Sequence, residues 1–243
     1  MKKTYTILSC IAVLVLVVYY LIPDSFFVET VFPMEEGVTI TKYDDRDDGG
    51  QSDASLEIKD STLNFKCRLG LDTTKYAWCG MLWNFDPDTL KAYRNWIFVD
   101  TLVLDLTTKG TNEILVKLWA YDPDVTDVKK KRSFRLLMKE VALAGGHERL
   151  AVPMEQFYTP DFWYKDGHVD RALNNRHQES MALLEISSGW NHPRGEDFTL
   201  VIHEISAKGL SNFWFGVVLF VFLGLTIVAV GFRHHVKNDE SKN

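Results

Sequence analysis

Short runs of alternating hydrophobic and polar residues fill most of the chain between positions 38 and 207. Turn residues separate these runs, and almost none of them has the 3.6-residue period of an amphipathic helix. The expected strands are 38–43, 54–59, 63–69, 78–85, 98–107, 113–121, 133–143, 148–153, 180–187 and 197–207. About ten short strands of this kind predict a mainly β fold with a single sandwich or barrel domain.

The strand expected at 113–121 has two unlike faces. Because side chains alternate along a strand, one face holds only apolar residues, namely Ile114, Val116, Leu118 and Ala120. The other face holds a cation and two aromatic residues, namely Lys117, Trp119 and Tyr121. The apolar face predicts the core, and the second face is a candidate binding surface.

Two segments lack the strand pattern. The first, 87–93, predicts a single helical turn that closes a sheet edge. The second, 154–177, is a connection rich in aromatic and charged residues, and irregular connections of such length are often functional. Its aromatic residues Phe162, Trp163 and Tyr164 either line a site or close the open end of the sandwich.

Two uncharged stretches, 4–23 and 213–232, are each close to the roughly 20 residues that cross a bilayer as a helix. We expect two transmembrane helices. A signal peptide is the alternative for the first stretch, since Lys2 and Lys3 precede it. No small-x-small cleavage pattern follows its apolar run, so an uncleaved anchor is expected.

Basic residues such as Lys2, Lys3 and Arg233 lie on the terminal side of both stretches. The positive-inside rule then places residues 1–3 and 233–243 in the cytoplasm of a bacterial inner-membrane protein. Residues 24–35 are expected as a linker and 36–209 as the exported, periplasmic or extracytoplasmic domain. The chain has a formal net charge of −6, and its exported part is more acidic still, which argues against nucleic acid as a partner.

The stretch from Asp44 to Ser52 reads DDRDDGGQS. This sequence favours a loop, because Asp and Gly are rare in strands and glycine permits a positive φ. A structural calcium ion could be held by its carboxylates, those of Asp44, Asp45, Asp47 and Asp48. In the interpretation that we favour, Arg46 neutralises carboxylates within the loop, which then acts as a conformational clamp at the sheet edge.

Cys67 and Cys79 are the two cysteines between the apolar stretches, and they lie near the ends of neighbouring expected strands. An oxidising compartment allows them to form a disulfide. The alternative is a pair of buried free thiols.

Several of these stretches carry a resemblance to a known family, namely VTITKYDDRDDGGQSDASLEIKDSTLNFKCRLG, YAWCGMLW, PMEQF, FWY and FTLVIHEISAKG. Over residues 36–209 the chain resembles a bacterial exported sensor domain, a carbohydrate-binding-module-like jelly roll of the galactose-binding type. Such domains lie between two membrane helices and are joined to a cytoplasmic output such as a diguanylate cyclase or a DNA-binding module. Only RHHVKNDESKN follows the second apolar stretch, so we expect a separately encoded output protein.

Carbohydrate sites combine aromatic faces with polar groups that bind hydroxyls. The candidate ligand-binding residues are Lys117, Trp119, Tyr121, Trp163, Tyr164, His177 and Trp190, with Arg46 and Arg194 as further donors. The chain has no motif of a hydrolase or a phosphate-binding loop, so we expect no enzyme and assign no catalytic residue. If the chain were a glycosidase, which needs two carboxylates, Asp161 and Asp166 beside Trp163 would be the first pair to test.

The sequence therefore predicts a two-pass membrane protein with one exported jelly roll. This domain would bind a carbohydrate-like ligand or an envelope protein, without a cofactor other than the calcium ion considered above, and signal to a partner in the membrane. The alternative is a non-sensing envelope structural or assembly factor whose sandwich docks another protein.

Overall fold

The computed structural model describes residues 2–22, 25–33, 38–59, 61–85, 93–210 and 212–240. The chain forms two compact units, one made of Met1–Phe27 with Gly209–Asn243 and the other of Val28–Lys208. The expected helical turn at 87–93 falls mostly on residues 86–92, which lie outside the described part of the chain.

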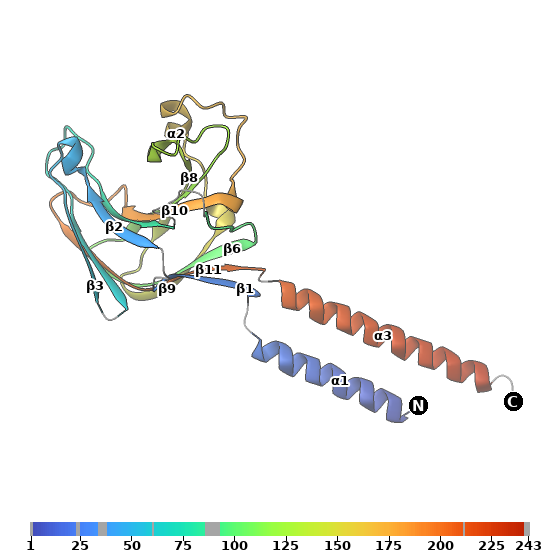
Figure 1. Cartoon of the computed structure of the whole chain (residues 1–243). Coiled ribbons are helices and arrows are strands. Elements are labelled where there is room, and N and C mark those ends of the chain that lie inside the picture. The colour runs from blue at the N-terminus through green and yellow to red at the C-terminus, as the bar shows by residue number, and fades with distance from the viewer. Residues whose placement is uncertain are drawn as a thin grey trace. The chain divides into compact units, whose positions relative to one another are not determined.

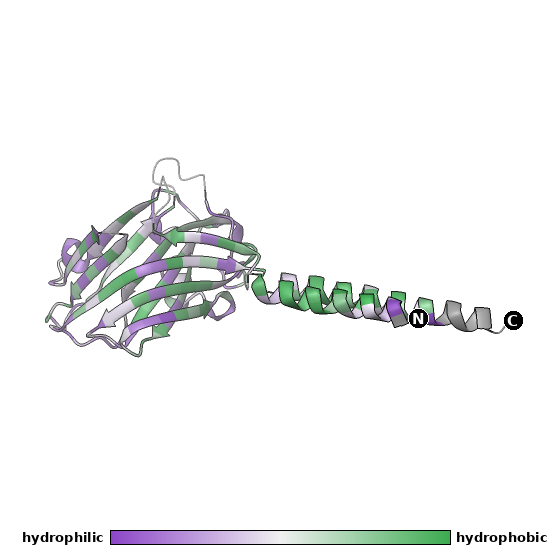
Figure 2. Cartoon of the chain, turned by 90° about the horizontal axis from the view of Figure 1, so that it is seen from below, coloured by the Kyte–Doolittle hydropathy of each residue, from purple (hydrophilic) through white to green (hydrophobic). Residues whose placement is uncertain are grey.

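The first unit contains the helices α1 (Lys2–Leu21) and α3 (Phe213–Glu240), which lie against each other. Both are long and apolar enough to cross a membrane, and Figure 2 shows that hydrophobic residues run along them. They coincide with the two uncharged stretches of the sequence. Near the second helix the ring of Phe26 packs 4.4 Å from that of Phe213, between centroids.

The second unit is a β-sandwich of two antiparallel sheets (Figure 1). Sheet A has the order β3 (Asp53–Lys59), β4 (Thr62–Arg68), β11 (Asp197–Gly209), β6 (Val99–Lys109) and β9 (Gly146–Pro153), and β1 (Phe27–Phe32) also pairs with β11. Sheet B has the order β2 (Thr39–Asp44), β5 (Cys79–Asn84), β10 (Met181–Ser188), β7 (Glu113–Ala120) and β8 (Arg135–Ala142). The sandwich confirms the predicted mainly β class, while its assignment to the galactose-binding type stays a prediction.

Alternation along the strands creates the core. On β7, Ile114, Val116 and Leu118 are fully buried, as the sequence predicted. Their neighbours on β10 and β5 are also inaccessible, for example Ile186 and Trp83. Because burying one large aliphatic side chain contributes about 1.5–3 kcal/mol, these interior faces fix the register of the sheets.

All ten expected strands are present, with ends that differ by at most two residues. The structure adds β1, which lies in the segment that we expected to be a linker. Short helices fill the connections, namely η1 (Asp45–Asp48), η2 (Lys131–Ser133), η3 (Met154–Gln156), α2 (Asp161–Asp166) and η4 (Gln178–Ser180). The last three belong to or border the long aromatic connection.

A disulfide joins Cys67 on β4 to Cys79 on β5, which confirms the predicted pair. It links sheet A to sheet B, since β4 belongs to the first and β5 to the second. The two cysteines are 12 residues apart, and closing a loop of that size in the unfolded chain is worth about 3 kcal/mol in the chain-entropy model.

Candidate binding surface

The acidic stretch forms the helix η1, and Asp44 caps its start. Asp44 Oδ1 accepts hydrogen bonds from the backbone N–H of Arg46 at 3.2 Å and from Arg46 Nε at 2.9 Å. The side-chain hydrogen bond from Arg46 holds the pKa of Asp44 below its ordinary value. Arg46 also lies 3.2 Å from the carboxylate of Asp53. Arg46 is therefore a counter-charge within the loop, as the clamp interpretation requires.

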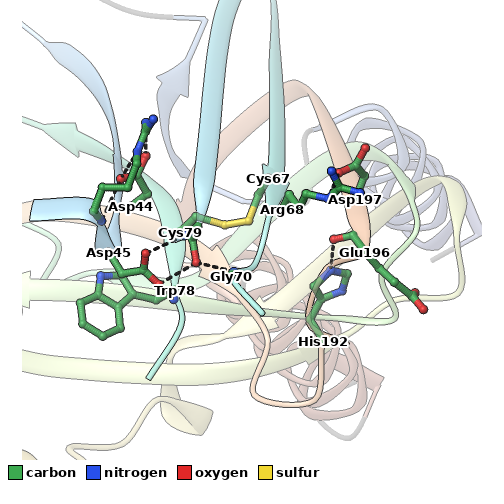
Figure 3. The surroundings of a disulfide bond; sticks show 12 residues. Asp44, Asp45, Cys67, Arg68, Gly70, Trp78, Cys79, His192, Glu196 and Asp197 are labelled. Atoms are coloured by element: carbon green, nitrogen blue, oxygen red, sulfur yellow. Dashed lines mark hydrogen bonds and ion pairs between the residues drawn. A yellow bond between two sulfur atoms is a disulfide. The ribbon is translucent and has the colours of Figure 1, made fainter. Parts of the chain in front are cut away.

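Asp45 is buried and its carboxylate accepts three hydrogen bonds (Figure 3). Oδ1 binds the backbone N–H of Ser52 at 2.8 Å, while Oδ2 binds the Ser52 hydroxyl at 2.6 Å and the backbone N–H of Trp78 at 3.3 Å. Gly50 makes this possible, because a Cβ at position 50 would lie 2.1 Å from Asp45 Cγ. Asp45 thus ties the loop to the segment that leads into β5 and the disulfide.

The other two carboxylates of the loop, Asp47 and Asp48, are exposed. Asp48 lies 3.7 Å from Arg132, between the charged atoms. Among the residues that the structure describes, which include the whole loop, no three His, Cys, Asp or Glu side chains are placed to hold a metal ion. The calcium interpretation gains no support from this arrangement.

Replacing Asp45 by alanine is expected to lower the free energy of unfolding by about 3 kcal/mol, because buried donors lose their acceptor. Urea unfolding of the full chain, followed by tryptophan fluorescence, measures the change. Asp48→Ala is the matched control and should leave the unfolding curve unchanged. Equal destabilisation by both variants would contradict the role assigned to Asp45.

A buried carboxylate, that of Glu185, lies at the centre of the outer face of sheet B, the face turned away from the sandwich interior. Oε1 accepts hydrogen bonds from the Tyr43 hydroxyl at 2.5 Å and from Lys117 Nζ at 2.8 Å. Oε2 accepts hydrogen bonds from Trp119 Nε1 at 3.0 Å and from Lys131 Nζ at 2.7 Å. These four donors come from β2, β7 and η2, so one carboxylate holds three elements together. We call these five residues the Glu185 cluster.

Electrostatics within the Glu185 cluster favour its charged form. Burial alone would raise the pKa of Glu185, but the ammonium groups of Lys117 and Lys131 lower it to about 2. Burial, together with the charge of Glu185, raises the pKa of Tyr43 well above its ordinary value. The Lys131 ammonium also lies 5.1 Å from the ring centroid of Trp119 and 5.2 Å from that of Tyr43, within reach of cation–π attraction.

Most of the aromatic side chains predicted to stack on a sugar are buried or partly buried. Trp119 and Trp163 are 7% and 5% exposed and belong to one apolar cluster on the outer face of sheet B. Trp163 Nε1 donates to the carbonyl of Phe134 at 2.8 Å. Tyr121 and Tyr164 are partly buried against the same cluster. The structure therefore brings four predicted residues together, and α2 of the long connection supplies two of them.

Trp190 is the predicted aromatic residue that is exposed, at 59%, and it lies two residues after the end of β10. Its backbone N–H donates to Glu113 Oε1 at 2.8 Å, and its Nε1 lies 3.4 Å from Glu140 Oε1. The hydroxyl of Tyr158, a residue that is 45% exposed, donates to the same Glu140 oxygen at 2.6 Å. This hydrogen bond raises the pKa of Tyr158 to about 12. We call Trp190, Tyr158, Glu140 and Glu113 the Trp190 platform.

The remaining predicted residues lie elsewhere. His177 is buried beside Asp122 and Glu179. Arg194 donates to the carbonyls of Gly70, Asp72 and Lys75 and so holds a loop. Asp161 is exposed at the start of α2 and pairs with Arg171 at 3.0 Å, and Asp166 ends the same helix.

Sequence reasoning missed several residues of this surface, namely Tyr43, Glu113, Lys131, Glu140, Tyr158 and Glu185. One of them had a visible signal: Glu185 is the single charge in MALLEISS, a strand that is otherwise apolar or small. The others gave none. Lys131 and Tyr158 lie in connections that fold over sheet B, and Tyr43 and Glu140 depend on which strands pair in that sheet.

No protein-family model and no curated protein matches the chain. Solved structures similar to it include a family 11 carbohydrate-binding module of a cellulosomal cellulase of Clostridium thermocellum, with 9% identity and a TM-score of 0.48 over 75% of this chain and 95% of that one. A family 30 carbohydrate-binding module has 11% identity and a TM-score of 0.41 over 66% and 92%. The agarase AgWH50C has 8% identity and a TM-score of 0.44 over 75% and 24%. At these values the likeness assigns no ligand to this chain.

Proposed function

We propose that the β-sandwich binds a carbohydrate at the Trp190 platform. The observation that carries the proposal is the exposed side chain of Trp190, whose backbone N–H is held by Glu113. Its indole and the hydroxyl of the exposed Tyr158 donate to the same oxygen of Glu140. An apolar ring face of a sugar stacks on such an aromatic side chain, and adjacent carboxylates accept hydrogen bonds from its hydroxyls. Because both rings are already held, little side-chain entropy is lost on binding.

A glycan array probed with the full chain in nanodiscs tests this proposal. We expect at least one oligosaccharide to bind, and Trp190→Ala to weaken that binding at least tenfold. Phe162→Ala is the matched control, since Phe162 is also an exposed aromatic residue but lies on α2. It should bind as the unchanged protein does. Silence on every glycan, or equal binding by Trp190→Ala, would contradict the proposal.

The two apolar helices support the location of the protein in a membrane. We infer that α1 and α3 span a bacterial inner membrane, with both termini in the cytoplasm and the sandwich on the other side. The basic residues beside the terminal ends of the apolar stretches favour this orientation. The disulfide between the sheets fits an oxidising compartment.

The contacts of β1 support a sensing role. Glu29 on β1 accepts a hydrogen bond from Trp96 Nε1 at 3.2 Å and lies 3.6 Å from Arg94. Arg94 forms a β-bridge with Met181, the first residue of β10, and Trp190 follows the other end of that strand. Residues 22–26 join β1 to α1. We infer that a shift of β10 on ligand binding reaches α1 by this route and is detected by a partner protein in the membrane.

Replacing Glu29 by glutamine is expected to leave glycan affinity unchanged but to abolish a ligand-dependent change between the helices. A spin label on Cys10, the free cysteine of the chain, and a second on α3 at Leu223→Cys allow the distance to be measured with and without glycan. Glu57→Gln, on the exposed side of β3, is the control. An unchanged response in Glu29→Gln would contradict the route.

Exposed apolar side chains in the connection from β4 to β5 favour a second function. Leu71 and Tyr76 are 70% and 86% exposed, as expected of a surface that docks another protein. In that case the chain is an envelope assembly factor without a glycan ligand. Silence on the array, together with a partner whose capture is lost in Tyr76→Ala, would favour it.

A further inference from the structure

A small pocket lies apart from the residues of the Trp190 platform. It has a volume of about 140 Å³ and is lined by Asp124, Arg135, Ala172, Leu173, Asn174, Asn175 and His177. Two of these side chains, Arg135 and His177, are 1% and 8% exposed. Buried titratable groups at the wall of a cavity are costly unless they are held by partners, and both are held.

Arg135 is fixed on three sides. Its Nε and Nη2 both donate to Asp122 Oδ2, at 3.1 Å and 2.5 Å, and Nη1 lies 3.4 Å from the Tyr164 hydroxyl. The guanidinium carbon lies 4.5 Å from the ring centroid of Trp163. Arg has five N–H donors, and these hydrogen bonds use three. The guanidinium can therefore donate to a ligand in the pocket without leaving Asp122.

His177 is held from both ring nitrogens. Nδ1 lies 3.0 Å from Glu179 Oε1, and Nε2 lies 3.6 Å from Asp122 Oδ1. Its backbone has a φ of 51°, in the left-handed region. A sparsely populated backbone conformation costs free energy, and residues in such conformations are concentrated at binding sites.

The charges around the pocket disfavour an anionic ligand. Arg135 and Asp122 neutralise each other, and Asp124 at the rim leaves an excess of negative charge. The lining offers donors, those of Arg135 and of the Asn174 and Asn175 amides, and also acceptors, the amide oxygens of the asparagines and the carboxylate of Asp124. A hydroxyl group both donates and accepts, so a neutral polyol satisfies such a lining, while a carboxylate or phosphate does not.

The volume limits the size of the ligand. Since a water molecule occupies about 30 Å³, the pocket holds roughly the volume of four or five waters. We propose that it binds the terminal residue of a neutral glycan, as an end-group site separate from the Trp190 platform. This inference rests on the proposed carbohydrate-binding function.

Saturation-transfer NMR of the full chain in nanodiscs, which contain no sugar detergent, tests the pocket. The probes are glucose, galactose, mannose and N-acetylglucosamine, with glucuronate as the charged counterpart. Ala172→Trp fills the pocket from its exposed rim, whereas Ala151→Trp places the same side chain at an exposed position on β9. These substitutions leave the buried Arg135 pair intact.

At least one neutral monosaccharide should give a saturable signal that falls at least tenfold in Ala172→Trp and persists in Ala151→Trp and Trp190→Ala. Three results would overturn the inference: no signal from any neutral sugar, a signal that survives in Ala172→Trp, or glucuronate as the only probe whose signal Ala172→Trp removes. If Trp190-dependent binding on the array remains in those cases, the proposed function stands and the pocket assignment alone fails.

Discussion

Glu185→Gln is expected to lower the free energy of unfolding of the sandwich by about 3–5 kcal/mol, the usual cost of removing one partner from a buried ion pair. The glutamine cannot neutralise Lys117 and Lys131, which lie 2.8 Å and 2.7 Å from the carboxylate. The Trp119 indole and the Tyr43 hydroxyl would also lose a charged acceptor. Urea unfolding of the full chain measures the loss. Glu57→Gln, an exposed strand carboxylate, is the control and should have little effect.

The same variant should change the response to acid. The pKa of Glu185 is about 2 in the folded protein, compared with the ordinary value of 4.5 that applies to the unfolded chain. Because the folded pKa is the lower one, the carboxylate contributes stability above about pH 4.5 and loses it as the pH falls towards 2. The difference in unfolding free energy between the unchanged protein and Glu185→Gln should therefore shrink over this range. A difference that is constant from pH 7 to pH 2 would contradict the assignment.

Asp122→Asn is expected to cost a similar amount, about 3–5 kcal/mol, because it leaves the guanidinium of Arg135 buried without a counter-charge. Both side chains are 1% exposed, and the closest contact between them is 2.5 Å. The stacking of Arg135 on Trp163 keeps the guanidinium from turning towards water. Thermal unfolding of the full chain gives the size of the loss.

A double-mutant cycle separates the interaction energy of this ion pair from the effect of the substitutions on packing. Arg135→Met keeps the length of the side chain and removes its charge. The double variant Asp122→Asn with Arg135→Met should be less destabilised than the two single effects added together. Strict additivity would show that the pair contributes little beyond the space that it fills.

The strands could be predicted from the sequence because they depend on local pattern, and the disulfide because only two cysteines lie between the apolar stretches. Alternation on β7 identified Ile114, Val116 and Leu118 as core, and each is fully buried. Cys67 and Cys79 lie at the ends of strands that the pattern also identified, and they form the bond. Arg46 lies two residues from Asp44, so its pairing is local as well.

The candidate site was harder to predict because its contacts are long-range. Glu185 receives hydrogen bonds from residues 142, 68, 66 and 54 positions away. Trp163 is buried because the long connection folds onto sheet B. The hydrophobic periodicity of the sequence does not predict where an irregular connection packs. β1 was missed because its pattern is short and its partner β11 lies at the other end of the β-sandwich in the sequence.

Hydroxyl-radical footprinting of the full chain tests the central claim, that a carbohydrate binds on the exposed ring of Trp190. Oxidation is measured by mass spectrometry with and without the oligosaccharide that the array selects. Oxidation of Trp190 and Tyr158 should fall at least threefold on binding, while Tyr76, the most exposed of these aromatic residues, should be oxidised equally in both samples. Unchanged oxidation of Trp190 in the presence of saturating glycan would contradict the claim.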